Sequence, residues 1–267
     1  MRIVNLSSGS KANSTFIGFN ETKILIDAGL SEKILCEHLN QINERMENIN
    51  AIFVTHEHID HIRAIKMLAK KYDIDFYFHE ELINSGKLAD IKFKEGRVHT
   101  FTTELVNIGD LQVQPFEISH DAVRPVGFVV NVFGSKSKAG FATDLGIVSE
   151  SVKQALSGSK IVFLESNYDE EMLLGGKYPL ILKRRISSEH GHLSNEQSLE
   201  LAKFLYDNGT KCFVLSHISE NNNTYELALS NFVDYFESNN IKLNQDVIIK
   251  LSFQMKHGNN FTLKEEF

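Results

Sequence analysis

The side chains best suited to chemistry are crowded into one hexapeptide, HEHIDH, at residues 56–61. It holds three of the 11 histidines and two acidic residues of a chain of 267 residues. Imidazole nitrogens and carboxylate oxygens are the usual protein ligands of zinc and related divalent ions. An HxHxDH motif arises by chance on the order of once in a thousand such chains. The hexapeptide therefore predicts a metal site and not a solvated polar loop.

The spacing within the hexapeptide predicts two pairs of ligands. The apolar run 51–55 predicts a strand, and residues two apart in an extended chain face the same way. His56 and His58 are therefore expected to bind one ion. Asp60 and His61 follow where the chain turns into a helix, and they point toward a second ion. An HExxH zinc-binding helix is excluded, because the fourth residue after His56 is Asp60 and no helix precedes it.

Six residues cannot complete two coordination shells, so further ligands must come from other strand ends. His120, Asp144 and His217 each follow a predicted strand, and we expect all three near the hexapeptide. Each by itself is also typical of a turn or of a half-buried polar residue. Glu57 and Ile59, which lie between the ligands of the hexapeptide, are expected to face away and to bind nothing.

The elements that must position these residues alternate between the period of strands and the period of helices. The predicted strands are 2–6, 14–19, 23–29, 50–56, 74–79, 97–102, 111–120, 127–134, 138–144, 160–166, 210–217 and 247–252. The predicted helices are 31–46, 60–73, a short helix after residue 79, 195–209 and 224–240. We expect Asp60 to be the N-cap of the second helix. Ser194 with Gln197 resembles a capping box for the helix 195–209, and Gly209 a C-cap.

Many strands joined by hairpins, with helices interspersed, predict an α/β fold of two packed sheets in one domain over residues 1–267. The alternative is an α/β fold with one mostly parallel sheet. The net charge of −7 does not indicate a nucleic-acid binder, although bound metal ions and a local basic patch would reverse the field. We find no membrane span or signal peptide, and we expect Cys36 and Cys212 to be isolated thiols. These features favour a cytoplasmic protein.

The hexapeptide, His120, Asp144 and His217, with Asp27 in ILIDAG, resemble the ligand motifs of the metallo-β-lactamase superfamily, in order and over essentially the whole chain. The resemblance implies a four-layer αββα sandwich of two mixed β-sheets with a dinuclear metal site at one edge. The implied ligands are His56, His58 and His120 for one ion, Asp60, His61 and His217 for the other, and Asp144 as a bridge. Asp27 is expected to orient a ligand histidine from behind. The ions are Zn or Mn, with Fe as a third candidate.

Finer motifs resemble one branch of this superfamily, the YycJ/WalJ-like bacterial proteins, which are described as metal-dependent 5′-to-3′ DNA exonucleases. These motifs lie at 7–15, 119–128, 165–195 and 215–223. The segment around GHLSN also resembles ribonuclease Z, whose corresponding histidine assists catalysis. By that resemblance His192 is a catalytic residue, whereas by itself it is equally typical of an exposed residue before a helix.

The expected reaction is exonucleolytic hydrolysis of the phosphodiesters of DNA, in the 5′-to-3′ direction, by a hydroxide shared between the two ions. Asp60 and His192 are the candidate catalytic residues, and His192 is expected to protonate the leaving oxygen or to hold a non-bridging oxygen. The side chains that could contact phosphates are Ser8, Lys183, Arg184, Arg185 and Asn221. The three basic residues are equally compatible with a solvated helix face.

Other functions remain open at this point. The same scaffold could cleave a thioester, as glyoxalase II does, a small phosphodiester, or RNA 3′ ends, as ribonuclease Z does. A flavodiiron-type redox protein would need cofactor domains for which this chain has no room. A non-catalytic regulator is disfavoured because none of the expected ligands is missing. We expect a nucleic acid as the partner, no membrane, and either a monomer or a homodimer.

Overall fold

The chain folds into two mixed β-sheets, which the structure, a computed structural model, describes over residues 1–255 and 258–263. In spatial order the first sheet contains β14 (Asn260–Thr262), β1 (Arg2–Ser7), β2 (Ser14–Phe19), β3 (Thr22–Ile26), β4 (Ala51–Phe53), β5 (Asp75–His79) and β6 (Val98–Phe101). The second contains β13 (Ile248–Leu251), β12 (Cys212–Ser216), β11 (Ile161–Glu165), β10 (Lys138–Ala142), β9 (Val126–Val132), β8 (Leu111–Glu117) and β7 (Val106–Ile108). In each sheet, antiparallel hairpins pass into a run of parallel strands, from β3 to β6 and from β10 to β13.

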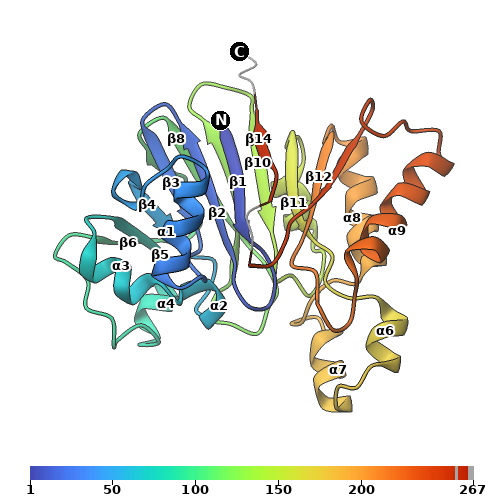
Figure 1. The fold of residues 1–267 in the computed structure, drawn as a ribbon, viewed down its shortest axis with the longest axis horizontal. Helices are drawn as coiled ribbons and strands as arrows, with labels where there is room; N and C mark the ends of the chain where they lie inside the picture. Colours follow the sequence, from blue (N-terminus) through green and yellow to red (C-terminus); the bar gives the residue numbers. More distant parts are fainter. Residues whose placement is uncertain (256–257, 264–267) are drawn as a thin grey trace.

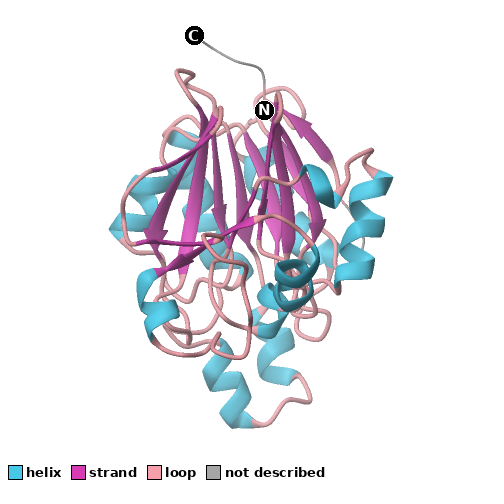
Figure 2. Ribbon diagram, turned by 90° about the vertical axis from the view of Figure 1, so that its left-hand side faces the viewer, coloured by secondary structure: helices cyan, strands magenta, loops and turns pink. Residues whose placement is uncertain are grey.

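Helices cover the outer faces of both sheets (Figure 1). The helices within the described residues are α1 (Glu32–Gln41), the short 3₁₀ helix η1 (Met46–Asn48), α2 (Ile59–Ile62), α3 (Ile65–Lys71), α4 (Glu80–Asn84), α5 (Glu150–Leu156), α6 (Glu170–Gly175), α7 (Leu180–Ile186), α8 (Asn195–Asp207) and α9 (Tyr225–Ser238). Figures 1 and 2 show α6 and α7 projecting past the end of the sheets that lies opposite the chain termini. The αββα sandwich predicted from the sequence is confirmed.

Three apolar layers hold this sandwich together. The middle layer joins the inner faces of the two sheets, where Phe53 of β4 meets Phe128 of β9 with ring centroids 5.7 Å apart. The outer layers pack α1 and α3 on the first sheet, and α5, α8 and α9 on the second. Both phenylalanines are fully buried, and burial of such a side chain contributes about 1.5–3 kcal/mol. The sheets are therefore rigid enough to position side chains at their edges.

The predicted helix that begins at the hexapeptide is wrong in two respects. It is divided into α2 and α3, and its N-cap is His58, so Asp60 lies in the first turn instead of capping it. The division has a cause, because Ala28 donates its N–H to His61 O and accepts the N–H of Ala64, both at close range. These bonds tie the helix start to the loop after β3 and interrupt the helical ladder.

The other element predictions are close to the structure. Ser194 and Gln197 form a complete capping box at the start of α8, and Gly209 follows that helix with a φ of +99°. The strands β7 and β14 and the helices α5 and α6 were not predicted, because each is short and only weakly periodic. Within the described ranges, none of the helices has the length and hydropathy that a membrane span requires.

Candidate metal centre

Three strands end at one edge of the sandwich with a residue whose φ is positive. Asp27 follows β3 with a φ of 60°, Asp144 follows β10 with 58°, and His217 follows β12 with 54°. Residues other than glycine rarely adopt this left-handed conformation, and such strain gathers at functional sites. Each of these sharp turns leaves a polar side chain at the edge where the two sheets meet.

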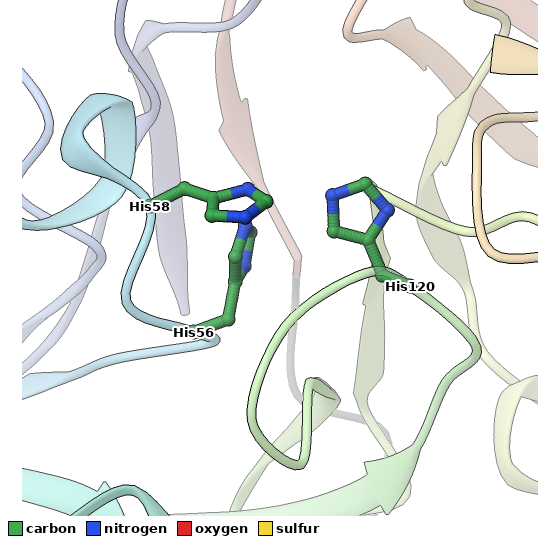
Figure 3. Close-up of side chains that lie close together, drawn as sticks. All are labelled: His56, His58 and His120. Atoms are coloured by element: carbon green, nitrogen blue, oxygen red, sulfur yellow. The ribbon is translucent and has the colours of Figure 1, made fainter. Parts of the chain in front are cut away.

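The first group of candidate ligands is His56, His58 and His120, whose ring nitrogens lie within 4.8 Å of one another. His56 and His58 come from the loop after β4, and His120 faces them from the segment after β8 (Figure 3). The ring centroids of His56 and His58 are 4.5 Å apart. The strand-end argument for this pair is wrong in detail, because β4 already ends at Phe53. The loop that follows β4 still brings the two rings together.

The second group is Asp60, His61 and His217, whose candidate ligand atoms also lie within 4.8 Å of one another. Asp60 and His61 lie on α2, and His217 lies at the end of β12. Asn13, which lies just before β2, anchors this helix. Its backbone N–H donates to Asp60 O at 2.8 Å, and its Nδ2 lies 2.9 Å from His61 Nε2. The sequence prediction missed Asn13.

Asp144 lies between the two groups. Its Oδ2 is 3.2 Å from His61 Nε2, and its Oδ1 is 3.5 Å from His217 Nε2 and 3.8 Å from His120 Nε2. Burial opposes ionisation of Asp144, but the neighbouring charges of His217 and His61 outweigh it and hold its pKa well below the usual range. A carboxylate in this position reaches ligand atoms of both groups, as a bridging ligand must.

Four of the histidines are anchored through the same ring atom. Their Nδ1 atoms lie near Thr55 Oγ1 for His56 (3.0 Å), Asp27 Oδ2 for His61 (2.7 Å), Gly191 O for His120 (2.9 Å) and Glu165 Oε1 for His217 (2.7 Å). Carboxylates and a carbonyl can only accept, and the Thr55 hydroxyl already donates to Asp27. Each Nδ1 must therefore carry the proton, which leaves Nε2 as an unprotonated ligand atom in the neutral ring.

The inward-facing atoms of this pocket fit a divalent cation. Among the described residues, His56 Nε2, His217 Nε2 and Asp144 Oδ2 are buried without a hydrogen-bond partner. Buried polar atoms are almost always paired, and unpaired ones indicate a ligand or ion. Nitrogen and carboxylate donors with oriented rings are what Zn²⁺, Mn²⁺ and Fe²⁺ accept. The donor set thus matches the metal site that the hexapeptide predicts.

Glu165, at the end of β11, is a central residue of the site that the sequence prediction missed. It is fully buried, and its Oε1 accepts from His217 Nδ1 (2.7 Å), His192 Nδ1 (2.9 Å) and Asp144 N (3.2 Å). Its Oε2 accepts two further backbone N–H groups, at 2.9 and 3.1 Å. Burial opposes its ionisation, but His192 and His217 lower its pKa to about 2. One signal could have found it, since an acid ends the apolar run IVFLE.

His192 lies beside the metal centre, and its side chain is 19% exposed. Its ring centroid is 5.1 Å from those of His120 and His217. Its backbone N–H donates to Ile186 O at 2.9 Å, so the end of α7 packs directly on this residue. The site therefore contains a partly exposed imidazole that is held by a buried carboxylate and can reach a substrate.

The pocket concentrates negative charge on buried carboxylates. Asp27, Asp144 and Glu165 are buried carboxylates within one cluster. Burial lowers the pKa of His217, but the charges of Asp144 and Glu165 outweigh burial and raise it to about 9. The negative charge of these carboxylates, which stabilises the protonated form of His217, also favours a bound divalent cation.

Glu57 has a structural role that the sequence prediction did not include. Its side chain is largely buried, and both carboxylate oxygens accept the N–H of Val123, at 3.2 and 3.1 Å. Val123 lies three residues after His120, so Glu57 ties the loop of the hexapeptide to the loop of the facing ligand. Ile59, in contrast, is 63% exposed.

The residues predicted to contact phosphates are dispersed around the site. Ser8 is buried, and its hydroxyl accepts the N–H of His217 at 2.8 Å. Asn221 is exposed and donates to Tyr178 OH at 2.9 Å. The basic residues are all on α7, where Lys183 donates to Leu174 O at 2.5 Å and Arg185 pairs with Asp121.

Comparison with known proteins agrees with this geometry. The family described as "Beta-lactamase superfamily domain" matches residues 22–218. Over 232 residues the chain is 39% identical to exodeoxyribonuclease YycJ of Bacillus anthracis, with 84% of each chain covered. Over 233 residues it is 38% identical to exodeoxyribonuclease WalJ of Streptococcus pneumoniae serotype 2, with 84% of this chain and 83% of the relative covered.

The fold has counterparts among solved structures as well. The metallo-β-lactamase fold protein YhfI of Bacillus subtilis superimposes with a TM-score of 0.72 at 13% sequence identity, over 97% of this chain and 98% of that chain. At 13% sequence identity the similarity is evidence for a shared fold and for nothing more. The matches in sequence and in fold agree, and the chain belongs to the metallo-β-lactamase superfamily, in the branch that contains YycJ and WalJ.

Proposed function

We propose that the protein is a metal-dependent exodeoxyribonuclease that hydrolyses the phosphodiesters of DNA from the 5′ end. The observation that carries the proposal is the pair of ligand groups on either side of Asp144, with Glu165 and His192 beside them. Relatives that are 38–39% identical over 84% of the chain and are named exodeoxyribonucleases support DNA as the substrate. The resemblance of the finer motifs supports the 5′-to-3′ direction.

The site residues divide into candidate metal ligands and one candidate proton donor. His56, His58 and His120 would hold one ion, Asp60, His61 and His217 a second, and Asp144 would contact both. Bound ions supply Lewis acidity, which neutralises phosphate charge and lowers the pKa of water. Zn²⁺, Mn²⁺ and Fe²⁺ all suit these donors.

The chain's own contribution to proton transfer comes from His192. Nδ1 of this imidazole donates to Glu165, so Nε2 is the ring atom that can carry a proton to a substrate oxygen. Protonation of the departing oxygen by a positioned acid contributes typically about 10²–10⁴-fold to the rate. Glu165 keeps the ring of His192 oriented so that Nε2 faces the partly open side of the site.

The decisive experiment compares substrates and variants. The metal-loaded protein is incubated with DNA labelled at the 5′ or the 3′ end, with RNA, and with a thioester, beside the Asp60→Ala/His61→Ala variant. Asp73→Ala serves as the matched control, because Asp73 is 70% exposed and pairs only with Lys94 among the described residues. We expect release of nucleotides from the 5′ end by the parent and the control, and not by the double variant.

Two outcomes would refute the proposal. If DNA stays intact while the thioester is cleaved, the protein is a different hydrolase on the same scaffold. If the double variant is as active as the parent, the reaction does not depend on the metal centre described above.

A further inference from the structure

The helical hairpin of α6 and α7, which we call the arm (residues 170–187), supplies none of the candidate metal ligands. It projects from the end of the sandwich at which α2, the helix that carries Asp60 and His61, also lies (Figure 1). The helix α7 contributes no buried side chain. A short helix without a buried face gains little stability from packing, so an exposed one with apolar residues indicates a missing partner.

The exposed side chains of the arm combine two chemistries. Leu174 is 72% exposed, Leu180 61% and Ile181 84%. The arm contains four basic residues against two acidic ones, in a chain whose net charge is −7. Leu180, Leu174 and Arg184 also line a groove of about 240 Å³ between the two helices. The arm therefore offers an apolar surface within a local excess of positive charge.

The base of the arm is built into the metal centre. Gly191 packs against the end of α7, since a Cβ there would lie 2.1 Å from Ile186 O and 2.3 Å from Arg185 O. Gly191 O in turn accepts from Nδ1 of His120. Arg185 binds Asp121, the residue next to that histidine, at 2.5 Å. A substrate bound to the arm is thus held at a fixed distance from the candidate ligands.

We propose that the arm binds an unpaired stretch of the DNA substrate; this inference rests on the proposed function. The basic residues of the arm contact phosphates, and its apolar tip, Leu180 and Ile181, contacts the faces of bases. The phosphate backbone matches the positive charge but offers no apolar surface to Leu180 and Ile181. Bases that are out of a duplex do offer one, because every base has a stackable face. The helix α7 spans seven residues, or about 10 Å, so the tip contacts DNA about 10 Å from the base of the arm.

The first test separates substrates by length. The variant Leu180→Ser/Ile181→Ser is compared with the parent on a long single-stranded oligonucleotide and on bis(p-nitrophenyl) phosphate, which is too short to reach the tip. We expect KM for the oligonucleotide to rise about tenfold, as for the loss of about two buried methylene groups, while both kinetic constants for the small diester stay within about twofold. Phe133→Ser is the matched control, because Phe133 is 69% exposed in the turn between β9 and β10, away from the arm.

The second test uses salt. Arg184 is exposed, and no hydrogen bond or ion pair of its side chain is found within the residues that the structure describes. If it contacts a phosphate, Arg184→Ala lowers the slope of log binding constant against log salt by about 0.7, the value for one single-strand phosphate contact. Fluorescence anisotropy with the Asp60→Ala/His61→Ala protein measures binding without cleavage. Lys136→Ala, an exposed lysine between β9 and β10, is the control.

The outcomes also distinguish this inference from the proposed function. If the parent cleaves DNA and the arm variants leave oligonucleotide KM and the salt slope unchanged, the inference fails and the proposed function stands. If DNA is not cleaved but binding still depends on the arm, the inference stands and the exonuclease proposal fails. Two further results overturn the inference: a parental dimer that becomes a monomer when the tip is changed, and tip-dependent binding to anionic lipid vesicles without binding to oligonucleotides.

Discussion

Replacement of Glu165 by glutamine tests whether this buried carboxylate sets the protonation of the metal-facing histidines. The substitution keeps the size of the side chain but turns one acceptor oxygen into an NH₂ donor. Oε1 of Glu165 accepts from His217, His192 and Asp144 N, and Oε2 accepts from two backbone N–H groups. No orientation of the amide satisfies all five donors.

The magnitude follows from a comparison of the two orientations. An NH₂ group at the Oε2 position faces two backbone N–H groups that cannot change into acceptors. At the Oε1 position it faces one backbone N–H and two imidazoles, which can accept if their protons move to Nε2. The second orientation leaves fewer unpaired donors, and each buried unpaired group costs about 1–3 kcal/mol. We therefore expect Glu165→Gln to lower the free energy of unfolding by about 1–3 kcal/mol and to place a proton on His217 Nε2.

That proton would occupy the lone pair which faces Asp144 at 3.5 Å. Loss of such an outer partner typically weakens metal binding by about 10–100-fold, and we expect this loss for the ion held by His217. Isothermal titration with Mn²⁺ or Zn²⁺ measures the affinity, and ¹⁵N-histidine NMR reports the tautomer. Glu150→Gln is the control for charge, because Glu150 is exposed and pairs with Lys153. A folded Glu165→Gln protein that binds both ions with parental affinity would refute the reasoning.

Three further results are expected. A chelator that removes the ions should lower the melting temperature of the protein. A ligand that binds only the native state stabilises it by about 2.7 kcal/mol per site when its concentration is 100 times its Kd. An unchanged melting curve would contradict a resident ion. His192→Ala should lower kcat on DNA by about 10²–10⁴-fold without changing the metal content measured by mass spectrometry, and loss of an ion would make His192 a ligand instead. Gly191→Ala should lower kcat because its Cβ would lie 2.1 Å from Ile186 O and must displace the end of α7; kinetics and a melting curve measure this, and parental kcat would count against it.

The sequence predicted the fold class because period-two and helical patterns are local properties. Most strands were found within a few residues, and the capping box of Ser194 and Gln197 was found from residue types alone. The boundaries failed where distant segments intervene. The helix at the hexapeptide is interrupted because Ala28, more than 30 residues earlier, donates its N–H to the carbonyl of His61 and accepts the N–H of Ala64, and the local pattern contains no sign of these bonds.

What the sequence by itself determined about this protein is the chemistry of the donors. HEHIDH, His120, Asp144 and His217 were predicted as ligands because residue type and position after a strand can be read along the chain. Only the tertiary structure decided how those donors are oriented and protonated. Glu165 lies 52 positions before His217, and Asp27 lies 34 before His61. Such pairs meet only when the parallel strands end at one edge, and a sequence period carries no information about partners that far apart.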